Sequence, residues 1–346
     1  MKKGILFIVL LLFLIRPVSA MEFTAPVVPE SGENYMPAQT ESFAEGLWYV
    51  VEKAVSQLQP SLAEAAKICL SLIAIVLLAS VLKGFSGAPQ RVVELVSTIT
   101  ISMLLLQPSN TLIRLGIQTV EELSEYGKLL LPVMTAAMAA QGGVTTSAAL
   151  YSATALFNGI LTAVVSKLIV PMLYVYLCLS IVNSAIGQEL LENLRKFVKW
   201  LMTWCLKLVL YAFTGYIGIT GVVSGSADAA AVKAAKLTIS GVVPVIGGIL
   251  SDASETILVS AGVMKSAAGV YGLLAILAVW IGPFIRIGMQ YLLLKITTAV
   301  CSVFGVKHSI TIIHDFSGAM GFLLAMIGTV CLLLLISTVC FMKGVV

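Results

Sequence analysis

Charged residues are scarce in this chain of 346 residues: 11% are Asp, Glu, Lys or Arg, while 59% are hydrophobic. A soluble globular domain carries about 25% charged and about 45–50% apolar residues. No segment long enough to form a soluble domain has that composition, so a soluble enzyme with a single membrane anchor is excluded. The apolar runs are continuous rather than alternating, which favours transmembrane helices over a β-barrel. The sequence therefore predicts an all-α, polytopic membrane protein.

Residues with catalytic or metal-binding chemistry are also rare. The chain has two histidines, His308 and His314, and its six cysteines lie in or beside apolar runs without CxxC spacing. The sequence contains no Walker A motif and no visible catalytic dyad. Its Lys and Arg residues do not cluster with aromatic residues as they do in nucleic-acid-binding surfaces. We therefore expect a protein that is not an enzyme, uses no cofactor or metal, and contacts the lipid bilayer rather than nucleic acid.

The N-terminal region has the features of a secretory signal peptide. Lys2 and Lys3 precede a short apolar run, which ends at the small-residue sequence Val18-Ser19-Ala20. We expect residues 1–20 to be removed, and an uncleaved short anchor is the alternative. Residues 21–66 would then form an acidic extracytoplasmic segment, in which the apolar spacing between positions 42 and 58 predicts an amphipathic helix.

Two apolar runs follow this segment. Residues 68–82 and 92–106 predict a membrane hairpin of two helices within residues 67–107. The connection between them carries Lys83 and Arg91, which favours a cytoplasmic position by the positive-inside rule.

The rest of the chain has the pattern of an internal duplication. Pro132 and Pro171 are matched by Pro244 and Pro283 at the same offset of 112 residues. The order of apolar and amphipathic stretches around these prolines agrees as well. We therefore predict two membrane repeats, one over residues 108–224 and the other over residues 225–346.

Each predicted repeat has a short apolar piece after its first proline, at residues 132–140 and 244–250, followed by a polar or small break at 141–143 and 251–255. Such pieces are too short to cross a bilayer alone. They predict broken or re-entrant segments, which mark the substrate site in many transporters; kinked helices are the alternative. About eight transmembrane helices are expected in total, within a range of seven to ten. Three crossings per repeat would make the repeats inverted, and four would make them parallel.

Charge is concentrated in the second repeat, around its short piece and in the long helix that follows. The residues concerned are Asp228, Lys233, Lys236, Asp252, Glu255, Lys265 and Arg286. Because a charge at the centre of a bilayer is costly, such residues usually face a cavity or pair with one another. They are the candidate conduit or partner contacts. The alternative is that they cap helix ends or extend to the membrane surface.

The run from Ser226 to Thr256, SADAAAVKAAKLTISGVVPVIGGILSDASET, resembles the core of the stage III sporulation protein AE family. The signal peptide, the acidic segment and the polytopic remainder fit this family too, so the resemblance covers nearly the whole chain. It implies an endospore-forming bacterium and a place in the mother-cell membrane that surrounds the engulfed forespore. It also implies partners within a secretion-like channel complex: other stage III sporulation proteins, including a secretion-type ATPase and ring-forming proteins. The family has no established catalytic residues to transfer.

The function that follows is that of a non-enzymatic core component of this channel complex, required for endospore formation. An independent secondary transporter, built from two repeats around a midplane site, is the alternative. Such a transporter would move a solute without partners, whereas a channel subunit would purify with them. The sequence is compatible with a homo-oligomer and does not identify a cargo.

Overall fold

The computed structural model describes the backbone of residues 26–37, 42–85, 89–242 and 247–343, and their side chains except at 59, 60, 85 and 220–265. Every regular element in these ranges is a helix, which confirms the all-α prediction. The elements are α2 (Glu30–Glu33), α3 (Phe43–Ser56), α4 (Leu58–Phe85), α5 (Gln90–Ala140), α6 (Val144–Val164), the π-helical turn η1 (Val165–Ile169), α7 (Val170–Ile186), α8 (Glu189–Val242), α9 (Gly247–Ser302) and α10 (Lys307–Lys343).

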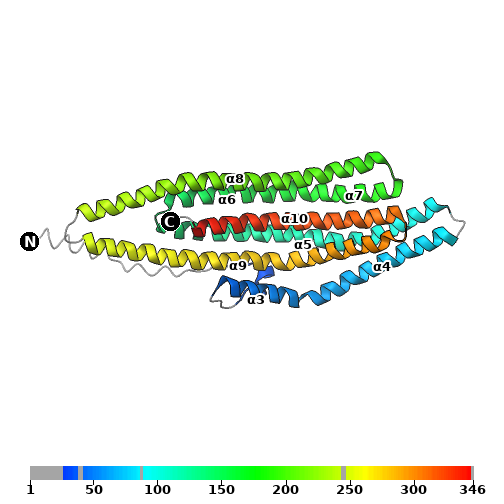
Figure 1. The fold of residues 1–346 in the computed structure, drawn as a ribbon, viewed down its shortest axis with the longest axis horizontal. Helices are drawn as coiled ribbons and strands as arrows, with labels where there is room; N and C mark the ends of the chain where they lie inside the picture. Colours follow the sequence, from blue (N-terminus) through cyan, green and yellow to red (C-terminus); the bar gives the residue numbers. More distant parts are fainter. Residues whose placement is uncertain (1–25, 38–41, 86–88, 243–246, 344–346) are drawn as a thin grey trace, which may run out of the picture.

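The long helices form an elongated antiparallel bundle (Figure 1). At 1.5 Å per residue, the 51 residues of α5 span about 75 Å, whereas the hydrocarbon core of a bilayer is about 30 Å thick. The bundle is therefore much longer than one bilayer is thick. Two of the turns between helices depend on glycine in the left-handed conformation, at Gly187 with φ 72° and at Gly305 with φ 70°.

Helix α10 lies at the centre of the bundle and packs against α5, α6, α7, α8 and α9 (Figure 1). The most apolar stretches of α9 and α10 are 61% buried, compared with 28–33% in the other candidate spans. These two helices therefore form the interior, and the remaining helices present apolar side chains outward, as a protein in contact with lipid does.

Six helical stretches in the described ranges are long and apolar enough to cross a membrane, whereas about eight were expected. The difference arises at prolines. Residues 145–167 and 172–186, expected as separate helices, are one continuous helix from α6 to α7. Pro171 has no N–H for the helical hydrogen bond, and the wider turn of η1 directly before it accommodates the distortion. Pro283 likewise lies inside the continuous helix α9.

The predicted short segments also belong to long helices. Residues 132–140 form the last turns of α5, which continues through Pro132. In the second half, residues 251–255 were expected to be a break, but they are helical within α9, and Pro244 lies outside the described residues. Continuous helices are favoured because each unpaired backbone group costs free energy in apolar surroundings.

The organisation into two repeats stays a prediction. The segment from α6 to α7 and the helix α9 run in the same direction in Figure 1, and each is followed by an antiparallel helix, α8 or α10. Repeats built on these hairpins would be parallel rather than inverted. The amphipathic helix expected between positions 42 and 58 is confirmed as α3, whose first turn is capped by the Ser42 hydroxyl. The predicted signal peptide lies outside the described residues.

A buried ion pair joins the two C-terminal hairpins. Asp315 of α10 is 3% exposed and pairs with Arg195 of α8. The Tyr176 hydroxyl of α7 donates to Asp315 Oδ1 at 3.4 Å. Gly318 leaves room for this tyrosine, because a Cβ there would lie 3.0 Å from Tyr176 Oη. One carboxylate thus connects three helices inside an apolar bundle.

Removing one partner of this pair should destabilise the bundle strongly. Asp315→Ala leaves the Arg195 charge buried and unpaired, so we expect a loss of about 3–5 kcal/mol in the free energy of unfolding. Replacing both partners, with Arg195→Met and Asp315→Leu, should recover most of it. Denaturant titration of the protein in detergent measures both effects.

The exposed pair between Lys196 and Glu192 on α8 provides the matched control. Glu192→Ala should leave the unfolding midpoint unchanged, because solvent screens this pair. Equal destabilisation by Asp315→Ala and Glu192→Ala would contradict a structural role for the buried pair.

Candidate functional site

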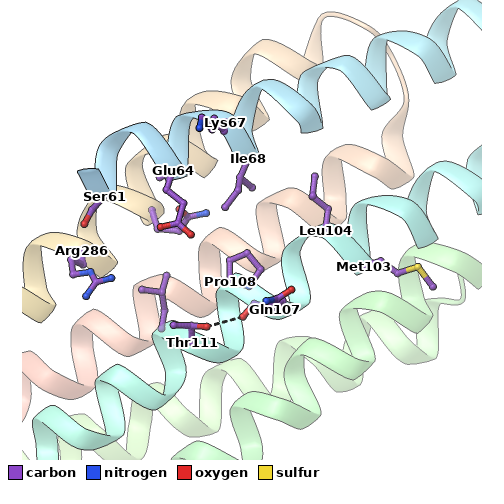
Figure 2. A pocket seen from close by; sticks show the side chains of 13 residues that line it. Ser61, Glu64, Lys67, Ile68, Met103, Leu104, Gln107, Pro108, Thr111 and Arg286 are labelled. Atoms are coloured by element: carbon purple, nitrogen blue, oxygen red, sulfur yellow. Dashed lines mark hydrogen bonds between the residues drawn. The ribbon is translucent and has the colours of Figure 1, made fainter. Parts of the chain in front are cut away.

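A polar groove of about 420 Å³ opens between the start of α4, the first half of α5 and the last third of α9 (Figure 2). Its polar lining residues are Ser61, Glu64, Lys67, Gln107, Thr111, Arg286 and Gln290. Apolar side chains, among them Ile68, Met103 and Leu104, complete the walls. Such a recess can hold a polar segment of a partner or a hydrophilic solute beside an otherwise apolar surface.

The sequence of α5 produces one wall of this groove. Pro108 lies inside the helix and cannot donate a hydrogen bond to the carbonyl of Leu104. One turn further on, the Thr111 hydroxyl donates to the carbonyl of Gln107 at 3.2 Å, as Figure 2 shows. Backbone and side-chain polar groups are therefore concentrated at this level of α5.

Three charges lie around the groove without a salt bridge. Glu64 and Lys67 are exposed on α4, and Arg286 is exposed on α9. None of the three forms an ion pair with any residue that the structure describes. Because unpaired charges avoid lipid, this part of the surface must face water or a polar partner.

The N-terminal segment covers α9 next to the groove. Tyr35 lies on Gly282, where a Cβ would be 2.9 Å from the phenol oxygen, and it donates to Gln57 Oε1 at 2.8 Å. Both side chains line a smaller cavity of about 120 Å³ that includes Arg286. Burial raises the pKa of the Tyr35 phenol, and the nearby Arg286 charge partly opposes that shift. The Ser31 hydroxyl bonds to Glu122 of α5, which fixes the segment across both helices.

The outward face of α5 changes character along its length. Its first half exposes apolar side chains, namely Val92, Val96, Ile99, Met103 and Leu106. Its middle exposes a polar stripe at helical spacing, formed by Arg114, Gln118, Glu121, Glu125 and Lys128. We call these five residues the α5 stripe. The same helix thus presents a surface suited to lipid and then one that is not.

Of the seven predicted site residues, the structure describes the side chain of one, Arg286. Arg286 lies in the groove, together with Glu64 and Lys67, which sequence reasoning did not select. The other six predicted residues lie where α8 ends and α9 begins, and their side chains are outside the described part, so their role stays a prediction. The α5 stripe could have been found from its spacing, because residues 112–128 have an amphipathic pattern.

Water should reach the groove but not the adjacent core. In a variant without native cysteines, Thr111→Cys should react with a charged, membrane-impermeant maleimide much faster than Ser102→Cys. Both positions are on α5, and Ser102 is 3% exposed while Thr111 lines the groove. Equal labelling rates at the two positions in native membranes would show that the groove is closed to solvent.

Comparisons with known proteins show the family of this chain. The family model for stage III sporulation protein AE matches residues 35–344 of this chain. The chain is also similar to stage III sporulation protein AE of Bacillus subtilis (strain 168), with 22% identity over 239 residues. That alignment covers 68% of this chain and 59% of the relative, so the chain spans less than two thirds of the relative's length. No solved structure matches it. Because the family match covers most of its length, the chain belongs to the stage III sporulation protein AE family.

Proposed function

We propose that this protein is a non-enzymatic core subunit of a channel complex between mother cell and forespore, located in the mother-cell membrane that surrounds the forespore. The family places the chain in sporulation, and its apolar helices indicate a multi-pass membrane protein. Other sporulation proteins are the expected partners. A secretion-type ATPase and ring-forming proteins among them belong to the proposal and rest on the resemblance.

The observation that carries the proposal is the α5 stripe. Four of its five members are ionisable, and all five are exposed on the outside of the bundle. A single charge at the bilayer centre costs at least about 2.5–3.5 kcal/mol on insertion scales, so hydrocarbon is not the environment of this face. This face therefore lies in water beyond the bilayer, along an aqueous path, or against a polar neighbouring subunit. A channel complex supplies the last two environments.

The groove supports the same conclusion from another side of α5. Its unpaired charges Glu64, Lys67 and Arg286 lie near the level of Pro108, where the outward face of α5 becomes polar. Polar surface therefore extends over α4, α5 and α9 at the middle of the bundle. A subunit that contacts polar partners or borders a conduit needs such a surface, whereas an isolated membrane anchor does not.

The transporter alternative gains no support. It relied on broken segments at residues 132–140 and 244–250 as a midplane site. The first of these is part of α5, and the described remainder of the second is part of α9.

Neutralising the acidic part of the α5 stripe should block spore formation. Glu121→Gln with Glu125→Gln keeps the size of both side chains and removes their charge. We expect a severe loss of spore yield after engulfment, while the protein still accumulates in the membrane, because a surface contact is lost and the fold is not. Heat-resistant spore counts and membrane immunoblots measure the two quantities.

Glu189→Gln, an exposed change at the start of α8, is the control and should sporulate normally. Normal sporulation of the Glu121/Glu125 double variant would remove the main support for a conduit or partner contact at α5.

The charges between Asp228 and Lys265 give a second test. If they line a conduit or bind a partner, Asp252→Ala or Glu255→Ala should block sporulation after engulfment without loss of the protein. If they only cap helix ends, each is worth about 0.3–1 kcal/mol and single changes should be silent. Lys53→Ala on the exposed face of α3 serves as the surface control. Wild-type spore yield from both single variants and their double variant would contradict a functional role.

A further inference from the structure

Three stacked aromatic rings lie on the outside of α8, near its start. The ring centroids of Phe197 and Trp200 are 5.9 Å apart, and those of Trp200 and Trp204 are 6.2 Å apart. Spacings of three and four residues place these side chains on one face of the helix. They are 48–57% exposed, and neither indole N–H bonds to a residue that the structure describes. We call these three residues the aromatic ladder.

A strip of lysines runs beside the aromatic ladder. Lys196, Lys199 and Lys207 are exposed, and a helix places their positions within about 80° of one another around its axis. Lys196 pairs with Glu192 at 2.7 Å, whereas Lys199 and Lys207 form no ion pair within the described ranges. Long side chains on a helix point back toward its N-terminus, so the ammonium group of Lys207 is directed toward the level of Trp204.

The buried ion pair fixes the direction in which the aromatic ladder faces. Arg195 points into the bundle and pairs with Asp315. Trp204 follows nine residues later, which is about two and a half helical turns, so it lies on the opposite face. The fold therefore holds the aromatic ladder and the lysines on the outward side of α8, which borders the bundle (Figure 1).

The surface of α8 changes from acidic to basic to apolar along the chain. Its first turn carries Glu189 and Glu192. The lysines and the aromatic ladder follow, and residues 208–219 contain no charged residue. That last stretch exposes Leu208, Tyr211 and Ile219. Water, lipid headgroups and hydrocarbon follow one another in the same order across one edge of a bilayer.

The edge of a bilayer is the environment that suits both kinds of side chain. A lysine charge is costly in hydrocarbon, and a group of large rings is unfavourable in water. At the edge, the rings can lie among the upper parts of the acyl chains while their N–H groups bond to headgroups. Lysines at this level extend to the phosphates.

We propose that the aromatic ladder anchors the start of α8 in the headgroup layer of the membrane, where Lys199 and Lys207 bind the phosphates of anionic phospholipids. Because no described carboxylate pairs with these two lysines, their charge remains for the lipid. Charge complementarity then favours anionic over zwitterionic headgroups. The inference does not depend on the proposed channel. A protein partner covering the same face is the competing occupant, and the tests below separate the two.

The first test measures the depth of the aromatic ladder. The full chain and its Trp200→Phe/Trp204→Phe variant are reconstituted in phosphatidylglycerol vesicles whose acyl chains carry bromine either near the headgroup or near the chain end. Trp48 and Trp280 are present in both proteins, so the difference in fluorescence reports the ladder. We expect bromine near the headgroup to quench it most. Stronger quenching by chain-end bromine, quenching by aqueous acrylamide alone, or no quenching by either would overturn the proposal.

The second test measures lipid preference. The midpoint of thermal unfolding of the full chain in a sugar detergent is followed while phosphatidylglycerol or phosphatidylcholine is added. Lys199→Gln with Lys207→Gln should weaken the binding of phosphatidylglycerol by about 25-fold, at about fivefold for each lysine beside an anionic surface. Binding of phosphatidylcholine should not change.

Arg114→Gln with Lys128→Gln is the matched control, because it removes the same charge from exposed positions on α5. It should bind phosphatidylglycerol as the wild type does. Equal affinities of the two double variants for phosphatidylglycerol would refute the assignment of lipid binding to α8.

Discussion

Polar bonds from one central helix hold this apolar bundle in register. Helix α10 forms hydrogen bonds or an ion pair with each long helix packed against it. Three serines form hydrogen bonds: Ser309 with Ser97 of α5 at 3.0 Å, Ser337 with Thr154 of α6 at 2.9 Å, and Ser317 with the carbonyl of Tyr291 of α9 at 3.3 Å. Asp315 accepts from Tyr176 of α7 and pairs with Arg195 of α8. Apolar side chains gain little by leaving lipid for protein, so packing and interhelical hydrogen bonds decide how membrane helices associate. Bonds at several levels along α10 fix both rotation and axial position.

The same constraint explains what could be predicted from the sequence. Composition and long apolar runs were enough to predict an all-α membrane protein. The spacing of apolar residues between Ser42 and Leu58 was enough to predict α3. The number of spans was not predictable, because Pro171 and Pro283 have the same local signature whether a helix ends or continues. Here apolar surroundings penalise a broken helix, and a π-turn before Pro171 keeps the helix intact at small cost. Only the packed neighbours reveal that outcome.

The polar sites were harder to predict than the fold. Arg286 was selected because a charge inside a long apolar run is conspicuous. Glu64 and Lys67 were not, because they lie at the edge of a span, where charges are ordinary. Their meeting in one groove depends on how α4 crosses α5 and α9, which no local pattern encodes. Arg195 pairs with Asp315, a partner 120 residues away in the sequence, so no local pattern predicts their contact.

The polar residues of this protein therefore fall into two groups with different roles. Those facing α10 are buried and paired, so they specify the structure and leave nothing for a ligand. Those around the groove and along the α5 stripe are exposed, and at the groove three charges are unpaired. The bundle does not need the exposed residues for its own cohesion, since none of them takes part in the hydrogen bonds and the ion pair that hold α10. Surface charge that does not serve the fold of an apolar bundle, and that lipid cannot accommodate, is best explained by what the protein contacts outside itself, which is why we assign function to the middle of α5.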